Sequence, residues 1–552
     1  MNSLNITGNV VDIFDQKVYP ATLEIVNGKI ISLSPLPGTA GVNPQLPFLV
    51  PGFVDSHVHI ESSMLVPSEF ARLAVVHGTV ATISDPHEIA NVCGVEGVEF
   101  MIDNGNKVPF KFNFGAPSCV PATIFETAGA ELDPTAVAQL LARDEIKYLS
   151  EMMNFPGVLS KDPGVMQKIA AAHALGKPVD GHAPGLRGEL AQQYIDAGIS
   201  TDHECFTYEE GLDKLQRGMK VLIREGSAAR NFDALIDLLH EYPDHIMFCS
   251  DDKHPDSLVA GHINQLCERA VAKGINIFNI LKAACINPVL HYKLDVGLLR
   301  VGDMADFIVL QDLEHFKVLA TYIDGNKVAE DGRSLIKGVT ATPINKFDCK
   351  MKSPDDFINL LSEINISTPM PVIEALDGQL ITNKINPTNY STNGIPVVDL
   401  ENDILKITAV NRYFDAPVAV GFIKNFGLKE GAIASSVAHD SHNIVAVGVN
   451  DECITKAINL VIANRGGVSC ANENAEIVLA LPVAGLMSAE DGYEVAAAYT
   501  AIDAMAKSFG ATLSAPFMTL SFMALLVIPH LKLSDKGLFD GDSFKLLNSY
   551  SN

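Results

Sequence analysis

The chain has 552 residues, and its 40 Lys and Arg stand against 66 Asp and Glu, which leaves a formal net charge of −26. Such acidity argues against a nucleic-acid or anionic-membrane partner, because the chain would repel phosphates. Apolar residues make up 47% and charged residues 19%, so the chain can bury a large core and is not disordered. At about 150 residues per domain, this length predicts three or four domain-equivalents.

The cysteines and the apolar runs bear on the compartment of the protein. The nine cysteines form no Cys-x-x-Cys pair, which disfavours a disulfide framework, a zinc ribbon and a thioredoxin-like motif. The start of the chain lacks the basic and apolar regions of a secretory signal. The apolar run Phe517–Pro529 is shorter than the ~20 residues of a membrane span and is expected in the core or a subunit interface. A reduced, cytoplasmic protein is predicted.

Two segments read as short strands. Residues 1–50 alternate apolar and polar side chains, with a turn signal at Asn27-Gly28. Residues 289–340 return to strands with Asp-Gly turns. We expect the two segments to pair into one small β-sandwich domain built from both flanks of the region between them.

Residues 51–288 alternate short apolar strands with helical segments. Eight strands alternating with helices predict an α/β fold, a parallel TIM-type (β/α)8 barrel, and about 240 residues is a normal size for it. The predicted strands are Phe53–His57, Thr79–Ser84, Phe110–Gly115, Ile146–Glu151, Pro178–Gly181, Ile199–Asp202, Lys220–Arg224 and His245–Ser250.

A third region follows the predicted barrel and the second β segment. Residues 340–354 carry the Pro and Lys content of a linker. Residues 356–552 mix strands and helices, which predicts a C-terminal α+β domain. The expected strands are 404–411, 416–423 and 444–449, and a helix is expected over 451–465.

Histidines and carboxylates follow the strands of the predicted barrel. In a parallel barrel the functional side chains stand at the carboxyl ends of the strands. His57 and His59 are two apart on the first strand, so both can face the barrel mouth. This pair alone is a weak signal, but its combination with the other strand ends is hard to obtain by accident. Those ends carry His87, Glu88, Glu151, His182, His203, Glu204, Asp251 and Asp252.

These residue types suit a site with two divalent metal ions. Glu151 can bridge the ions, with two imidazoles on each. Asp251 can bind a metal and accept a proton from a metal-held hydroxide, which is a strong nucleophile near neutral pH. The candidate ligands are His57, His59, Glu151, His182, His203 and Asp251.

The sequence also resembles a known family. PGFVDSHVHIESS and GLLRVGDMADFIVL are similar to the amidohydrolase superfamily. HVHIESSM, SDPHEIANVCG, EMMNFPGV, DGHAPGL, TDHE and SDDKHP, with RYFDAP, AHDSHN, ANRGG and LPVAGLMS in the tail, resemble the bacterial-type adenine deaminases over nearly the whole chain. The resemblance implies deamination of adenine to hypoxanthine and ammonia, in purine salvage or adenine catabolism, by a metal-bound hydroxide at a binuclear centre.

Cofactor and partner expectations follow from the same resemblance. The ions would be Mn or Fe, and Zn also suits ligands that are all imidazole and carboxylate. The partner would be a small purine base, without nucleic acid or membrane, and a homodimer is expected. Many superfamily members bridge their metals with a carboxylated lysine on the fourth strand. Here Glu151 ends that strand, and Lys147 lies well before it.

Several roles stay open at this level. Glu88 and Glu204 both qualify to protonate the purine ring. Asp251 is the expected catalytic acceptor, whereas Asp252 is expected to face the substrate or a lysine such as Lys253, or to form a surface salt bridge. His87 is expected to bind substrate, relay protons, hold a metal or shape its loop.

The tail carries one further polar motif. The run from His439 to Asn443, with a second histidine at His442, lies between apolar segments. It is expected to be either a substrate- or metal-binding loop at the barrel mouth or a surface turn.

Two other functions compete with adenine deamination. Another amidohydrolase, acting on a different amino-heterocycle or a cyclic amide, would share the same metal ligands. A non-catalytic scaffold of the same fold would have lost ligands, whereas every expected ligand type is present here.

Overall fold

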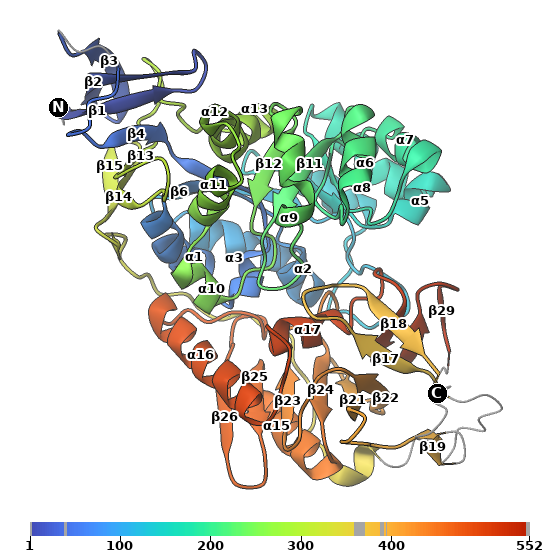
Figure 1. The fold of residues 1–552 in the computed structure, drawn as a ribbon. Coiled ribbons are helices and arrows are strands. Elements are labelled where there is room, and N and C mark those ends of the chain that lie inside the picture. The colour runs from blue at the N-terminus through green and yellow to red at the C-terminus, as the bar shows by residue number, and fades with distance from the viewer. Residues whose placement is uncertain (1–2, 38–40, 358–369, 387–390, 393–394, 548–552) are drawn as a thin grey trace.

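The structure is a computed structural model that describes residues 3–37, 41–357, 370–386, 391–392 and 395–547. Figure 1 shows the strands of the chain's N-terminal region at the upper left, the helices and strands of residues 53–292 beside them, and the C-terminal region below. The chain therefore reaches the C-terminal region only after it has completed the other two.

The first sheet is built from two distant segments. Its strands form one continuous hydrogen-bonded order, β16-β15-β14-β13-β4-β1-β2-β3. Phe307 of β13 pairs with Pro51 of β4, so the region between them leaves and rejoins the same sheet. The strands are β1 (Ser3–Asp12), β2 (Lys17–Val26), β3 (Lys29–Pro35), β4 (Phe48–Pro51), β13 (Phe307–Leu310), β14 (Val318–Ile323), β15 (Asn326–Glu330) and β16 (Arg333–Ser334).

The middle region contains the eight predicted strands, and their ends shift by at most two residues. They pair in parallel as β5-β6-β7-β8-β9 and as β10-β11-β12. An isolated parallel bridge between Val58 and Asp251 brings the end of β5 beside the end of β12. The strands are β5 (Phe53–Val58), β6 (Thr79–Ser84), β7 (Lys111–Ala116), β8 (Ile146–Met152), β9 (Val179–Gly181), β10 (Thr201–Asp202), β11 (Lys220–Arg224) and β12 (Ile246–Cys249).

Helices between and after these strands begin at clear local signals. Asp133 accepts a hydrogen bond from the Ala136 amide at the start of α4, and Asp162 caps α6 in the same way; in both, proline follows the cap. The helices are α1 (Pro67–Ala74), α2 (His87–Cys93), α3 (Val95–Gly105), α4 (Pro134–Leu141), α5 (Phe155–Leu159), α6 (Pro163–Ala174), α7 (Gly188–Asp196), α8 (Tyr208–Gln216), α9 (Phe232–Leu235), α10 (Pro255–Ala260), α11 (Ile263–Ala272), α12 (Ile277–Leu281) and α13 (Asn287–Tyr292).

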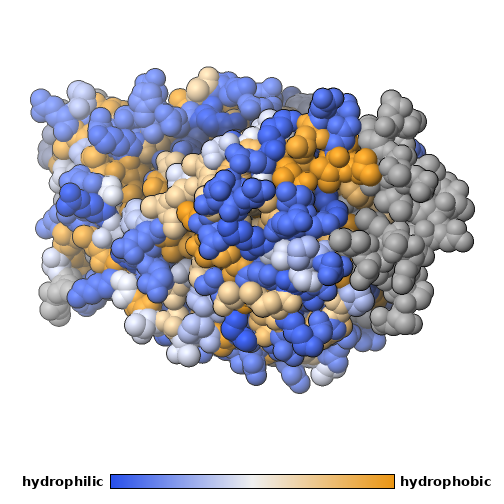
Figure 2. Space-filling view, turned by 90° about the horizontal axis from the view of Figure 1, so that it is seen from below, coloured by the Kyte–Doolittle hydropathy of each residue, from blue (hydrophilic) through white to orange (hydrophobic). Residues whose placement is uncertain are grey.

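The C-terminal region is built on a sheet in the order β18-β17-β22-β21-β24-β23-β25-β26. Seen from its side of the molecule, the exterior is mostly hydrophilic with scattered hydrophobic areas (Figure 2). The main elements are β17 (Val372–Ala375), β18 (Thr382–Ile385), β21 (Ile404–Val410), β22 (Ala419–Lys424), β23 (Ala432–Ser435), β24 (Ile444–Gly448), β25 (Gly467–Ala471), β26 (Glu476–Ala480), α15 (Asp451–Ala463), α16 (Gly492–Ser508), α17 (Pro516–Phe522), β27 (Leu531–Ser534) and β28 (Gly537–Asp540).

The apolar run near the end of the chain lies in the core. Phe517 to Leu526 are buried, and α17 occupies the first part of the run. Across the described part of the chain, no helix has the length and apolarity to cross a membrane. Of the two locations expected for this run, the core is therefore the observed one.

Candidate metal centre

His57 and His59 stand at the end of β5 with their rings converging. Their Nε2 atoms are 3.1 Å apart, and the Asp251 Oδ1 lies 3.8 Å from the first and 3.3 Å from the second. All three side chains are buried. Two imidazole nitrogens and a carboxylate oxygen that meet in this way form the donor set of a metal site.

His182 and His203 form a second group around Glu151. The Glu151 Oε2 lies 2.7 Å from Nδ1 of His182 and 3.1 Å from Nε2 of His203. Its other oxygen, Oε1, lies 3.4 Å from Nε2 of His59. One carboxylate therefore faces both groups of histidines, which is the geometry expected of a bridge.

The carboxylates between these histidines are held ionised. Burial raises the pKa of Glu151, but the adjacent His182 and His203 outweigh burial and hold that pKa well below its usual value. Burial likewise raises the pKa of Asp251, and Arg224 together with His59 lowers it further than burial raises it. Among the described residues, Nε2 of His182 has no hydrogen-bond partner. Ionised carboxylates beside a buried imidazole nitrogen that lacks a hydrogen-bond partner are suitable ligands for divalent cations.

His87 lies inside the same cluster. Its Nδ1 is 3.5 Å from Oε1 of Glu151 and 3.2 Å from Oδ2 of Asp85, and its ring is edge-on to His59. Asp85 was not singled out from the sequence. Its position at the end of the second predicted strand could have indicated that it belongs to the site.

Arg224 is the most consequential residue that the sequence analysis missed. It is the last residue of β11 and is fully buried. One guanidinium nitrogen, Nη1, donates to Oε1 of Glu204 at 2.5 Å and also to Oδ2 of Asp251. The sequence does place a basic side chain at the carboxyl end of the seventh predicted strand, and this position could have indicated Arg224.

The loop that contains His439 and His442 reaches this cluster. Nδ1 of His439 and Nε2 of His442 contact the two oxygens of Glu88, and both histidines are buried. Burial raises the pKa of Glu88, but the two histidines hold it well below its usual value. The surface-turn interpretation of this loop is therefore wrong.

Asp252 is also buried. It accepts a 2.5 Å hydrogen bond from Oγ of Ser62 and lies 3.7 Å from Nε2 of His439. The surface salt bridge that the sequence left open is therefore excluded, and Asp252 faces the same space as His439.

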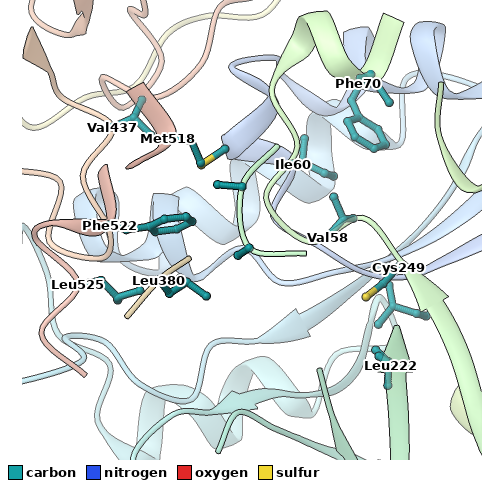
Figure 3. Packing of buried hydrophobic residues seen from close by; sticks show 14 of the residues in the cluster. Val58, Ile60, Phe70, Leu222, Cys249, Leu380, Val437, Met518, Phe522 and Leu525 are labelled. Carbon is teal, nitrogen blue, oxygen red and sulfur yellow. The ribbon is translucent and has the colours of Figure 1, made fainter. Parts of the chain in front are cut away.

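A cavity of about 20 Å³ remains between these groups, which is room for about one water molecule. Leu380, Phe522 and Leu525 of the C-terminal region line one side of it; we call these three residues the apolar cover. Figure 3 shows them together, across from Val58 and Ile60 of the middle region. In this arrangement of the side chains the cavity has no room for an organic molecule.

Arg412 fixes the His439–Asn443 loop in place. It is fully buried, and its guanidinium donates to the backbone oxygens of His442, Lys346 and Ala484 and to the side chain of Asn345. We expect Arg412→Met to destabilise the protein by about 3 kcal/mol, because several buried acceptors lose their donor. Urea unfolding measures this effect, and an unchanged midpoint would contradict it.

Two protein-family models match the chain. The Amidohydrolase family matches residues 48–328, and the Adenine deaminase C-terminal domain matches residues 379–545. The chain is 55% identical to the adenine deaminase of Sulfurovum sp. (strain NBC37-1) and 53% identical to that of Salinibacter ruber, each over 99% of both chains. The adenine deaminase of Methanosarcina mazei is 51% identical, also over 99% of both chains.

Solved structures match a smaller part of the chain. N-acetyl-D-glucosamine-6-phosphate deacetylase from Mycobacterium smegmatis covers 59% of this chain and 100% of its own, with a TM-score of 0.46 and 18% identity. The curated adenine deaminases match this chain over nearly its full length, and both family models match it as well. The two matched regions also meet at one buried cluster. The chain therefore belongs to the adenine deaminase family of amidohydrolases.

Proposed function

We propose that the protein hydrolyses adenine to hypoxanthine and ammonia. The observation that carries this proposal is 55% identity to an adenine deaminase over 99% of both chains. The convergence of β5, β8, β12 and the His439 loop on one buried cluster supports it. The products are a neutral purine and ammonia, so the acidic exterior does not oppose the reaction.

The fold that supports this activity is proposed to be a TIM-type barrel over residues 51–288. The parallel bridge between Val58 and Asp251 supports closure between the first and last strands. Residues 1–50 and 289–340 would form the composite β-domain, and residues 356–552 the C-terminal α+β domain. The cytoplasmic location and the homodimer stay predictions.

We propose two divalent ions, Mn or Fe with Zn as an alternative, in the candidate metal centre. The 3.1 Å approach of the His57 and His59 Nε2 atoms and the two-sided placement of Glu151 support this assignment. When bound, the ions would lower the pKa of a coordinated water and so supply the nucleophile. The residues proposed to hold them are His57, His59, Glu151, His182, His203 and Asp251.

Asp251 is the proposed proton acceptor. Its carboxylate is held ionised beside Arg224, so it can accept a proton from the attacking water and pass it to the departing amine. The second proton of the water restores the acid that protonates N1. The two hydrogens of the water therefore end on ammonia and on N1 of hypoxanthine.

Glu88 is the better candidate for delivering a proton to N1. One oxygen of Glu204 is engaged by Arg224 at 2.5 Å. Glu88 instead contacts His439, whose pKa rises to about 9 because the charges of Glu88 and Asp252 outweigh the effect of burial. Because Glu88 is itself held ionised, it would act as a relay that passes a proton from a protonated His439 to N1. His87 and Asp252 line the substrate space, and His442 holds the other oxygen of Glu88.

The direct test is the activity of the metal-supplemented protein. We expect ammonia release and loss of the adenine absorbance with adenine, and not with adenosine, cytosine or hydantoin. A chelator should abolish turnover, and added Mn²⁺ or Fe²⁺ should restore it. Metal analysis of the same sample should give about two ions per chain. Turnover of hydantoin in place of adenine would favour the cyclic-amide alternative.

A further inference from the structure

Lys532 is a fully buried lysine behind the apolar cover. It lies on β27 (Leu531–Ser534) with no exposed surface. Its Nζ donates to the backbone oxygen of Leu380 at 2.6 Å and to that of Phe522 at 2.9 Å. No carboxylate in the described part of the chain is hydrogen-bonded to it, and burial lowers its pKa to about 7.

Both acceptors belong to residues that line the cavity. Phe522 is the last residue of α17, and its ring stacks on His439 with centroids 5.1 Å apart. Leu380 precedes β18 and lies on the same side of the cavity. Figure 3 shows the two side chains next to each other. The amino group of one lysine thus links two segments that are distant in sequence.

A buried lysine in this place needs a physical reason. Burying a lysine without a carboxylate is unfavourable, and an apolar side chain would fill the space without that cost. The carbonyl of Phe522 stands at the negative end of α17, where a cation is favourable. Two further contacts brace the same segments: Oγ1 of Thr382 donates to the Leu531 carbonyl, and the Leu533 amide donates to the Met523 carbonyl. Among the hydrogen bonds of the described residues, those of Lys532 join Leu380 directly to Phe522.

We propose that Lys532 is a positioning residue for purine binding, which holds Leu380 and Phe522 side by side so that together they cover one face of the base. It acts through those residues and does not touch the reacting atoms. Flat apolar and aromatic surfaces bind a purine by stacking and by excluding water. This inference rests on the proposed function.

The test is Lys532→Met, which keeps the length of the side chain and removes its donors. We expect KM for adenine and the inhibition constant of hypoxanthine to rise together by about tenfold, a loss of about 1.4 kcal/mol of binding. The kcat should change less than threefold, and metal content should not change. Lys406→Met is the matched control, because Lys406 is also a largely buried lysine of the C-terminal region but pairs with Asp451. It should leave KM and the inhibition constant unchanged.

A Lys532→Met protein with wild-type KM and hypoxanthine inhibition would overturn the positioning role while leaving the proposed function intact. If that variant does not fold, Lys532→Gln and Lys532→Arg decide, since each retains a donor and should show a smaller rise in KM than Leu380→Ala. Equal KM values in the wild type and all three variants would overturn the inference. Wild-type protein that neither turns over adenine nor binds hypoxanthine in an equilibrium titration would overturn both proposals.

Discussion

Asp251→Asn is expected to lower kcat for adenine about a thousandfold, the scale of general acid–base catalysis by one positioned group. The amide keeps the size of the side chain but cannot accept the proton that Asp251 is proposed to carry to the leaving amine. KM should change little, because Asp251 lies beside the proposed metal ligands His57 and His59 and is proposed to act on the water rather than on the purine. Steady-state kinetics on protein of measured metal content give the result.

The control for this variant lies just before the same strand. Asp244 is exposed, pairs with Lys282 and lies two residues before β12, so Asp244→Asn should be as active as the wild type. An Asp251→Asn protein with full turnover and a full metal complement would refute the proposed proton acceptor. Loss of metal from that variant would instead assign Asp251 chiefly to ligation.

Glu151→Gln is expected to lose bound metal and, with it, nearly all activity. Both oxygens of Glu151 lie within 3.5 Å of imidazole nitrogens from four histidines, and a neutral amide removes the anion that these groups surround. Changes to groups that only support a ligand cost 10–100-fold in metal affinity, so removal of the proposed bridge should cost more than about 100-fold. Metal titration followed by activity measurement tests this expectation.

Glu145 offers the matched control, because it is exposed and precedes β8 by one residue. Glu145→Gln should retain metal and turnover. Two tightly bound ions in Glu151→Gln would show that a neighbouring acid, such as Asp85, holds the bridging position.

The strands of residues 51–288 were predictable because each is a short apolar run that ends in polar residues. The fully buried β6, for example, has the ends that the sequence predicts. His57 and His59 were predictable for a related reason, since alternate residues of a strand point to one side. Adenine deamination itself was predicted from the family motifs, and the comparisons confirm the family.

Other parts of the site lie beyond local sequence patterns. Glu88 and His439 are 351 positions apart, and nothing near either residue indicates that they meet. Phe522 and Leu380 are apolar, so the sequence does not distinguish them from other core residues. The choice between Glu88 and Glu204 also required Arg224, whose pairing is visible only in three dimensions.

Residues of the middle region and of the C-terminal region line the same cavity, although each region could be mistaken for a separate functional unit. Most of its histidines and acids come from residues 59–252, whereas Leu380, His439 and Phe522 come from the C-terminal region. If two relatives exchanged their C-terminal regions, the metal cluster of one protein would be combined with the apolar cover of the other. Glu88 would then contact histidines that did not evolve with it. Recombination near residue 340 should be poorly tolerated in this family, and the two regions should be inherited together.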